Sequence, residues 1–389
     1  MFRPQIQKTR TLFIIAFINI CLVIIVSSSL TYKEYDNVNL RYDSAQLMDE
    51  CIKSIKDITD LTIIEEDYYQ TGLIGLEQSR LTTVSDNENI DNILNSKIIT
   101  TNPNFAAFMV LLFEEIGLEK GDSIAISMTG SFPGANIATL SACKSMDLKP
   151  VILSSLGSSS WGANRENLTW IQIENHLYNN KLIDYESIAV SIGGKNDLGD
   201  NISDEGIEII EDIILANNKS LVNEPTLDLS ISEKINLLGD ISKYKAFINI
   251  GGGASSLGSG IGKKYIREGI ISPLIKDEIQ EIYYENEDAY TYYSDFKKSI
   301  AYKFLDNDIY LINIKNINSL VSQFGMSYLN DRGLNNVNEG LLFYEVEKFN
   351  VNVIWFVLVF SVLISFIVGV YSHLEIQKKM KEDEVDSIL

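Results

Sequence analysis

Histidine, cysteine and proline are scarce in this chain of 389 residues. Two histidines argue against a histidine-rich metal site, and three cysteines without a CxxC pair argue against zinc ribbons and thioredoxin-like redox motifs. Six prolines exclude a proline-rich linker protein. Basic residues are also few, since 32 Lys and Arg stand against 53 Asp and Glu, a net charge of −21. Because binding to phosphates needs clustered cations, we expect no nucleic-acid partner, and we expect neither a metal nor a cofactor.

Two long uncharged apolar runs lie near the ends of the chain, at residues 11–30 and 351–371. Each has about the length of a helix that crosses a bilayer. Basic residues precede the first run and follow the second, so the positive-inside rule places both termini, including the tail 372–389, in the cytoplasm. Residues 31–350 are then extracytoplasmic. A cleaved signal peptide is the alternative for the first run.

The sequence between the runs predicts an α/β domain. Residues 31–100 are expected to form a membrane-proximal helical segment, with an amphipathic helix over 42–58. Helices and short apolar strands alternate over 101–280, which predicts a mostly parallel sheet with helices on both faces, a Rossmann-like arrangement. A Tyr-rich region, 281–350, is expected to complete the domain. The expected helices are 105–116, 135–146, 170–178, 206–216 and 231–241, and the expected strands are 123–128, 151–156, 187–192, 246–250 and 309–314.

Four of the expected strands end in loops rich in Gly and Ser. The carboxyl ends of parallel strands share one edge of a sheet, and ligands of open parallel sheets bind there. Backbone N–H groups and helix N-termini at such an edge favour an anion such as a carboxylate. The alternative is that the loops are only turns, since none matches GxGxxG or the Walker pattern. The candidate ligand-binding residues are Thr129, Gly130, Ser131, Gly134, Asn136, Ser160, Trp161, Gly162, Asn164, Gly193, Gly194, Lys195, Asp197, Gly251, Gly252 and Gly253.

Support for catalysis is weaker. Ser131 or Ser160 could serve as a nucleophile, but a nucleophile needs a base, and Lys195 and Lys263 are the candidates. Lys195 could instead pair with Asp197 or with a ligand carboxylate. The single histidine between the runs, His176, is expected to pack on a helix surface. Cys51 and Cys143 could form a disulfide or stay unpaired and buried.

Several of these segments together resemble one bacterial family. The resemblance is carried by Gly130-Ser131-Phe132-Pro133-Gly134-Ala135-Asn136, Ser160-Trp161-Gly162-Ala163-Asn164, Thr169-Trp170, Gly193-Gly194 and Ile248-Asn249-Ile250-Gly251-Gly252, and it covers roughly residues 65–260. The family is the poly-gamma-glutamate system protein family, PgsW type. The resemblance implies a protein of the bacterial cytoplasmic membrane that works beside the subunits that make and export this surface polymer. It implies no defined activity and no catalytic residues.

Two functions follow as hypotheses. The first is a membrane-anchored accessory protein of poly-gamma-glutamate synthesis or export whose external domain binds glutamyl carboxylates. The second is an extracytoplasmic hydrolase or transferase that acts on gamma-glutamyl bonds through a Ser nucleophile. The acidic net charge opposes the first hypothesis at long range, so a binding site would have to attract the polymer locally.

Overall fold

The computed structural model describes residues 9–59, 71–83, 90–258, 266–278, 294–326 and 342–386. It divides into two compact units. The first contains the two ends of the chain, residues 1–36 and 344–389, and the second contains residues 37–343. The Tyr-rich residues 283, 284, 290, 292 and 293 lie outside the described ranges.

The second unit is built on a seven-stranded sheet with the order β7-β6-β3-β2-β8-β10-β9. Every strand pair is parallel except β10–β9, which is antiparallel and closes one edge. The chain starts at the centre with β2, adds strands in one direction through β7, and then returns to add β8 on the other side of β2. The strands are β2 (Ser123–Thr129), β3 (Lys149–Ser155), β6 (Ser187–Ser191), β7 (Leu221–Val222), β8 (Ala246–Ile250), β9 (Gly269–Ile271) and β10 (Tyr310–Ile314).

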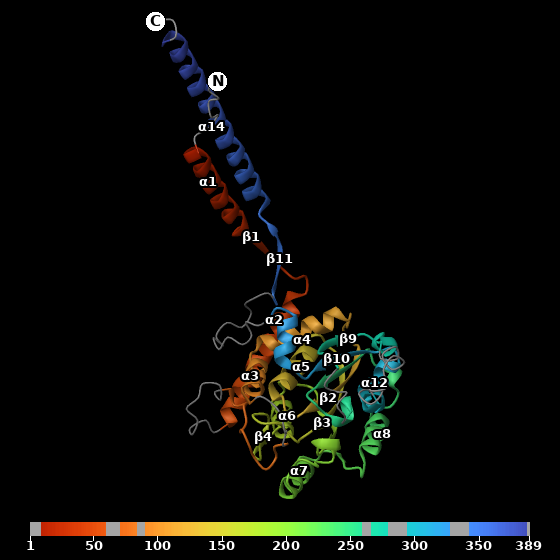
Figure 1. Cartoon of the computed structure of the whole chain (residues 1–389). Helices are drawn as coiled ribbons and strands as arrows, with labels where there is room; N and C mark the ends of the chain where they lie inside the picture. The colour runs from red at the N-terminus through yellow and green to blue at the C-terminus, as the bar shows by residue number, and fades with distance from the viewer. Residues whose placement is uncertain are drawn as a thin grey trace. The chain divides into compact units, whose positions relative to one another are not determined.

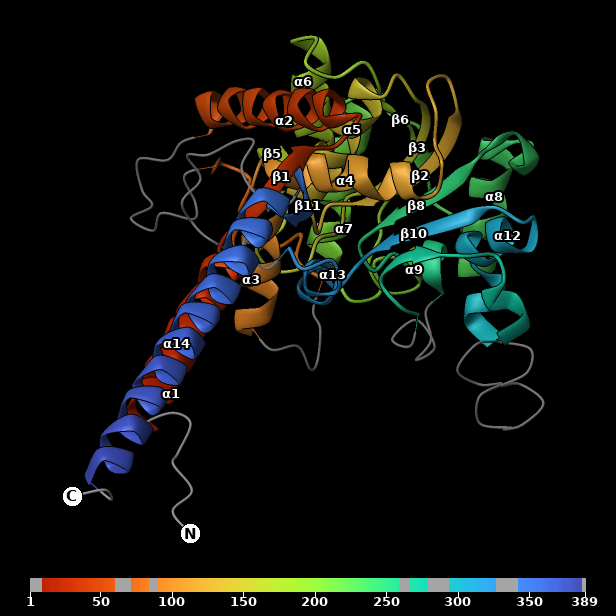
Figure 2. The same ribbon diagram turned by 90° about the horizontal axis from the view of Figure 1, so that it is seen from above.

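Helices cover both faces of this sheet (Figure 2). One face is packed by α2, α4, α5 and α6, which contact one another as well, with α3 and α13 beside them. The other face is packed by α8, α9 and α12. The mostly parallel sheet and its two helical layers confirm the α/β part of the expected fold. The helices are α2 (Val38–Ile58), α3 (Ile90–Thr100), α4 (Asn104–Glu115), α5 (Pro133–Ser145), α6 (Trp170–Asn179), α7 (Asp204–Ala216), α8 (Leu227–Leu238), α9 (Ala254–Leu257), α12 (Ile300–Asp306) and α13 (Ile317–Gln323).

The strands are apolar on both sides because both sides are covered. In β8, Phe247 faces the α12 layer, where its ring stacks on Phe304 at a centroid distance of 4.7 Å. Its neighbours Ile248 and Ala246 are fully buried as well. Uninterrupted apolar strands are the pattern that a parallel sheet between two helical layers requires.

The range 31–100, expected as a membrane-proximal helical segment, includes helix α2. Helix α2 packs directly on α4 and α5, so it belongs to the α/β unit. The physical reason is its apolar face, on which Met48, Cys51 and Ile55 are completely buried. Arg41 at the start of α2 binds the carboxylate of Glu114 and donates to the carbonyl oxygen of Leu342, which ties the beginning and the end of the unit together.

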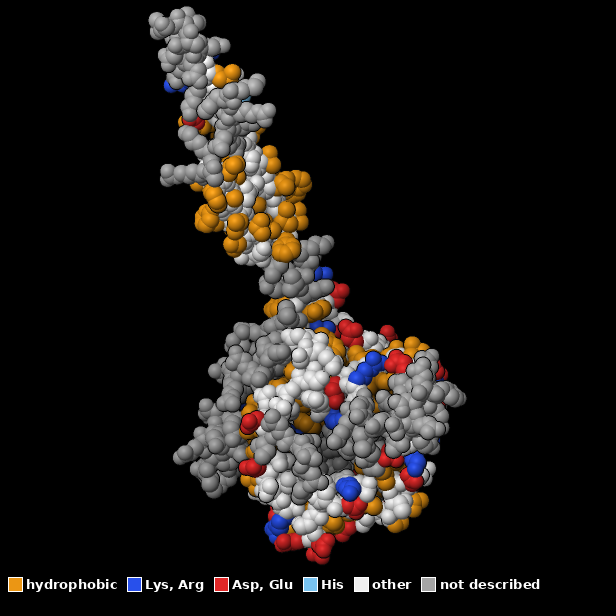
Figure 3. Space-filling view, viewed as in Figure 1, with side chains coloured by type: hydrophobic (Ala, Val, Ile, Leu, Met, Phe, Trp, Pro, Cys, Tyr) orange, Lys and Arg blue, Asp and Glu red, His pale blue; other side chains and the backbone are white. Residues whose placement is uncertain are grey.

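The first unit contains two helices and a short ribbon. Strands β1 (Leu30–Glu34) and β11 (Tyr344–Phe349) pair antiparallel, so residues 344–349 belong to this unit and not to the α/β domain expected over 281–350. Helix α1 (Thr9–Ser27) contacts helix α14 (Val351–Asp386). Figure 1 shows the two helices running side by side, and Figure 3 shows apolar side chains gathered around them.

Among the described residues, one helix is long and apolar enough to cross a membrane, over Val351–Lys378. The apolar part of α1 is shorter, Thr11–Ser27. The expected helix over 11–30 ends early because the hydroxyls of Ser27 and Ser28 bond back to carbonyl oxygens four residues before them, and the chain then enters β1. By length, only α14 meets the criterion for a span.

Candidate functional site

The glycine-rich loops meet at the carboxyl edge of the sheet. A Cβ atom on Gly130 would lie 2.5 Å from the carbonyl oxygen of Leu156, and one on Gly193 would lie 3.0 Å from Cβ of Ser155. One on Gly251 would lie 2.1 Å from Oγ1 of Thr129. The loops after β2, β3, β6 and β8 therefore approach one another so closely that glycine is needed where they touch.

Much of this edge is closed by packing between the loops. Gly162 lies between its own loop and the loop after β2. Its Cβ would meet Oγ of Ser158 at 2.2 Å and the carbonyl oxygen of Gly130, in the loop after β2, at 2.7 Å. Gly134 is pressed in the same way against the carbonyl oxygen of Thr100 at the end of α3. These glycines serve the fit between loops, and their role in ligand binding stays a prediction.

Asn164 and Trp161, in the loop after β3, bind residues 71–83, a segment whose contact with the loops was not expected from the sequence. The side chain of Asn164 accepts from the backbone N–H of Leu76 and donates to its carbonyl oxygen, both at 2.8 Å. The backbone N–H of Trp161 donates to the same carbonyl oxygen at 2.7 Å. On the other side, Arg80 binds Glu166 and Glu205. Residues 71–83 are thereby fixed against the loop after β3.

The loop after β6 is strained and carries a buried ion pair. Gly193, Gly194, Asn196 and Asp197 all have positive φ, which costs energy at the two residues that are not glycine. This backbone conformation places Asp197 so that its carboxylate accepts a hydrogen bond from Nζ of Lys234 at 2.6 Å. Ser191 and Ser230 also donate to this carboxylate.

Two buried lysines at this edge were missed by sequence reasoning. Lys234 in α8 donates to Oγ of Ser191 and of Ser255 as well as to Asp197. Lys97 in α3 donates to the carbonyl oxygen of Ser131 and to Oγ of Ser159, and its Nζ atom lies 3.5 Å from the ring centroid of Phe132.

A signal for both lysines was present in the helix periodicity. Lys234 falls on the apolar stripe that Ile231 and Leu238 define in α8. Lys97 stands four residues after Ile93 on α3. A lysine at an apolar helix position indicates a buried partner.

Three unpaired polar atoms lie near the boundary between β2 and β8. This is the switch point of the sheet, because strands that follow β2 in the chain are added on one side of it and β8 is added on the other. Oγ1 of Thr129, Oδ1 of Asn136 and Oδ1 of Asn249 are buried without a hydrogen-bond partner among the described residues. Nδ2 of Asn136 donates to the carbonyl oxygen of Thr129, and Nδ2 of Asn249 donates to that of Gly251. Ligands of doubly wound sheets bind outside this point. Here the side chains lie beneath the surface.

The candidate nucleophiles and the candidate base are not brought together. Oγ of Ser131 accepts from the backbone N–H of Ser159, and Ser160 is half-buried. Lys195 is exposed, and its ammonium contacts neither serine among the described contacts. Asp197, the other partner expected for Lys195, binds Lys234 instead. Lys263, a second lysine considered for this role, lies outside the described residues.

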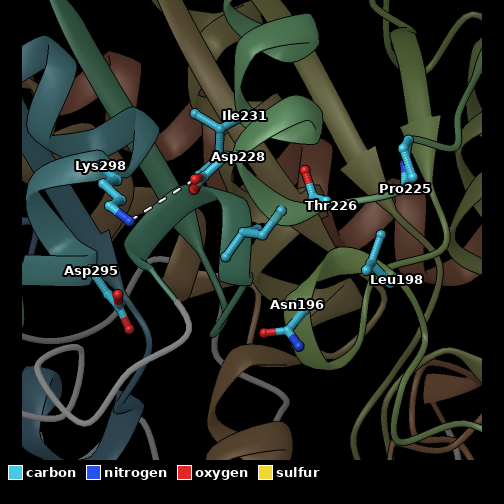
Figure 4. Close-up of a pocket in the computed structure, with 9 residues that line it drawn as sticks. Asn196, Leu198, Pro225, Thr226, Asp228, Ile231, Asp295 and Lys298 are labelled. Atoms are coloured by element: carbon cyan, nitrogen blue, oxygen red, sulfur yellow. Dashed lines mark ion pairs between the residues drawn. The ribbon is translucent and has the colours of Figure 1, made fainter.

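An open pocket of about 380 Å³ lies at the same edge, beyond β6 and β7, and we call it the carboxyl-edge pocket. Its wall combines the amide of Asn196, the first turn of α8 and the charged side chains of Asp228, Asp295 and Lys298. Figure 4 shows Asp228 and Lys298 directed toward each other, at 3.9 Å. Both side chains are largely exposed, so their ion pair is weak and an incoming ligand can replace it. Its lining residues are Asn196, Leu198, Pro225, Thr226, Leu227, Asp228, Ile231, Asp295 and Lys298.

The cysteines and His176 are structural. Cys51 and Cys143 are free and buried, and burial raises the pKa of the Cys51 thiol to about 12. His176 is joined through Nε2 to the hydroxyl of Ser54 at 2.8 Å, which links α6 to α2 and fits the expected packing role. Among the described residues, no group of His, Cys, Asp and Glu could hold a metal ion.

Comparisons with known proteins identify no relative. No protein-family model matches the chain, and neither a curated protein nor a solved structure matches it.

Proposed function

We propose that this chain is a membrane-anchored accessory protein of poly-gamma-glutamate synthesis or export, and that its α/β domain binds glutamyl units of the polymer in the carboxyl-edge pocket. The pathway rests on the resemblance of the loop motifs to the poly-gamma-glutamate system protein family. The place of binding rests on the pocket.

The anchor in this proposal is a helical hairpin that crosses the bacterial cytoplasmic membrane twice, with both termini in the cytoplasm. The exposed apolar side chains of α14 support it, and so does α1, whose Phe13 and Phe17 are about two-thirds exposed. Asn19 is the polar residue in the middle of α1, and its Oδ1 accepts from Oγ of Ser361 at 2.5 Å while its Nδ2 donates to Ile15. A polar side chain satisfied in this way can stand in lipid. At 1.5 Å per residue, the apolar part of α1 is about 26 Å long, so in this proposal the bilayer is locally thinned around it.

The observation that carries the binding proposal is the mixture of charges in the carboxyl-edge pocket. Each unit of a γ-linked polymer presents one carboxylate and one amide N–H. Lys298 and the first-turn amides of α8 suit the carboxylate, because a helix N-terminus favours an anion. Asp228 and Asp295 supply acceptors for the amide N–H. Lys298 supplies a short-range attraction for the carboxylate within a chain whose net charge of −21 repels a polyanion at long range.

Deletion of the gene tests the proposed role in the cell. We expect glutamate ligation to continue and surface polymer to fall. Wild type and Lys195→Gln should restore the polymer, and Lys298→Gln should restore it less well, because Lys195 is exposed outside the pocket lining. Unchanged surface polymer in the deletion strain would contradict the proposal.

A further inference from the structure

A second, more polar pocket of about 540 Å³ lies at the opposite edge of the sheet, and we call it the amino-edge pocket. It is formed where β6 and β7 begin and where α6 and α7 end. Its volume is in the range of small-molecule sites, roughly 300–1,000 Å³. None of the residues expected to bind the polymer lines it.

Side-chain amides dominate the wall of this pocket. Asn175, Asn179, Asn217 and Asn218 all line it, together with Tyr178. A primary amide both donates and accepts, which matches a pair of neighbouring hydroxyl groups. Tyr178 is 40% exposed, so its ring offers an apolar platform beside these polar groups.

The amides at the base of the pocket are held in a fixed orientation. Nδ2 of Asn175 donates to Oδ1 of Asn217 at 2.8 Å, and Nδ2 of Asn217 donates to the carbonyl oxygen of Ile213 at 2.7 Å. Oδ1 of Asn175 is buried and has no hydrogen-bond partner among the described residues. The Asn175–Asn217 hydrogen bond thus keeps the amide groups at the base of the pocket in one orientation.

The charges of the pocket are already paired with each other. Nζ of Lys219 lies 2.7 Å from the carboxylate of Glu186 and 3.4 Å from that of the buried Glu174. The helix ends at Asn179 and Ala216 present carbonyl oxygens, and the C-terminus of a helix disfavours an anion. The pocket therefore suits an uncharged ligand that is rich in hydroxyl donors.

We propose that the amino-edge pocket binds a neutral carbohydrate, with a sugar ring against Tyr178 and its hydroxyl groups on the surrounding asparagines. A neutral ligand is not repelled by the acidic domain. This site is separate from the carboxyl-edge pocket, so its failure would leave the proposed function untouched.

Binding is measured by calorimetry with the full chain in lipid nanodiscs, since alkyl-glycoside detergents would themselves present a sugar. The probes are chitotetraose, cellotetraose and maltotetraose, with tetragalacturonate as an acidic comparison. We expect at least one neutral probe to bind in the millimolar range or tighter. Its affinity should fall about tenfold or more in Tyr178→Ala and stay unchanged in Tyr310→Ala, a similarly exposed tyrosine at the start of β10.

Asn179→Ala, at an exposed position, is the second variant in case Tyr178→Ala fails to fold, and it should weaken binding in the same direction. The proposal is overturned if no neutral probe binds at about 10 mM. Stronger binding of tetragalacturonate than of every neutral probe would also overturn it, and so would unaltered affinity in folded Tyr178→Ala and Asn179→Ala.

Discussion

Nζ of Lys234 lies 2.6 Å from Oδ2 of Asp197, although both side chains are almost completely buried. The pair joins α8 to the strained loop after β6, which forms one wall of the carboxyl-edge pocket. Two serines from other elements, Ser191 and Ser255, also bind the ammonium group. The ion pair therefore fixes the geometry of the loop from beneath, through hydrogen bonds of its charged atoms to Ser191, Ser230 and Ser255.

Lys234→Met should destabilise the protein strongly, because it leaves the carboxylate of Asp197 buried without its cation. We expect a loss of about 3–5 kcal/mol in the free energy of unfolding, measured by chemical denaturation. Lys195→Met, at an exposed position in the same loop, should change it by less than about 0.5 kcal/mol. The double variant Lys234→Met with Asp197→Asn should recover part of the loss. If Lys234→Met and Lys195→Met had the same stability, the buried ion pair would not be needed for folding.

Gly162→Ala tests whether the loops are pressed together as described. Its new methyl group would meet Oγ of Ser158 and two backbone carbonyl oxygens, those of Gly130 and Ser131. We expect a loss of about 1–3 kcal/mol in thermal or chemical unfolding. Gly252→Ala is the matched control, because its Cβ would meet nothing within 4 Å. A Gly162→Ala protein as stable as this control would mean that the loops are further apart.

The hairpin of α1 and α14 predicts a specific cross-link. In a Cys21→Ser background, cysteines placed at Asn19 and Ser361 should form a disulfide under mild oxidation of native membranes, because these side chains are in contact. Cysteines at Phe13 and Ser361 should not, since Phe13 is directed outward and is 71% exposed. Cross-linking of both pairs to the same extent would contradict the pairing of the two helices.

Stability should fall as pH rises above the ordinary carboxyl range, partly because of Glu174. Burial raises the pKa of this carboxyl above its usual value of 4.5, so the folded state holds its proton more tightly than the unfolded state does. Between those two pKa values the folded protein binds more protons, and its stability therefore decreases with rising pH. Burial raises the pKa of Glu268 as well, which acts in the same direction.

Melting temperatures from about pH 4 to about pH 8 measure this dependence. The slope should be smaller in Glu174→Gln than in wild type. The exposed Glu119→Gln should keep the wild-type slope. A slope that is the same in all three proteins would assign the pH dependence to other groups.

The sequence predicted the long central strands of the sheet better than the short strand β7 and the separate strands β1 and β11. Apolar strands such as Ala246–Ile250 are visible because burial on both faces makes almost every residue apolar, with Asn249 as the single polar residue of this strand. Strand β7 has only two residues, Leu221–Val222, which is too short for any periodic signal. Strands β1 and β11 were missed because they pair with each other across more than three hundred residues, and local pattern carries no trace of such a partner.

The site was predicted in part. The loops could be placed at one edge, because parallel strands end together. Which residues of that edge face solvent depends on tertiary packing, and Asn164 and Gly162 turned inward against residues 71–83 and 129–131. Lys298 and Asp295 reach the carboxyl-edge pocket from just before α12, a region whose proximity to the loop after β6 no local pattern could give.

The measurement closest to the central claim is the affinity of the full chain, in lipid nanodiscs, for a γ-linked glutamate decamer. We predict that wild type and Lys195→Gln bind the decamer equally, that Lys298→Gln binds it about tenfold more weakly or worse, and that Tyr178→Ala binds it like wild type. Failure of wild type to bind the decamer, or undiminished binding by a folded Lys298→Gln protein, would contradict the account.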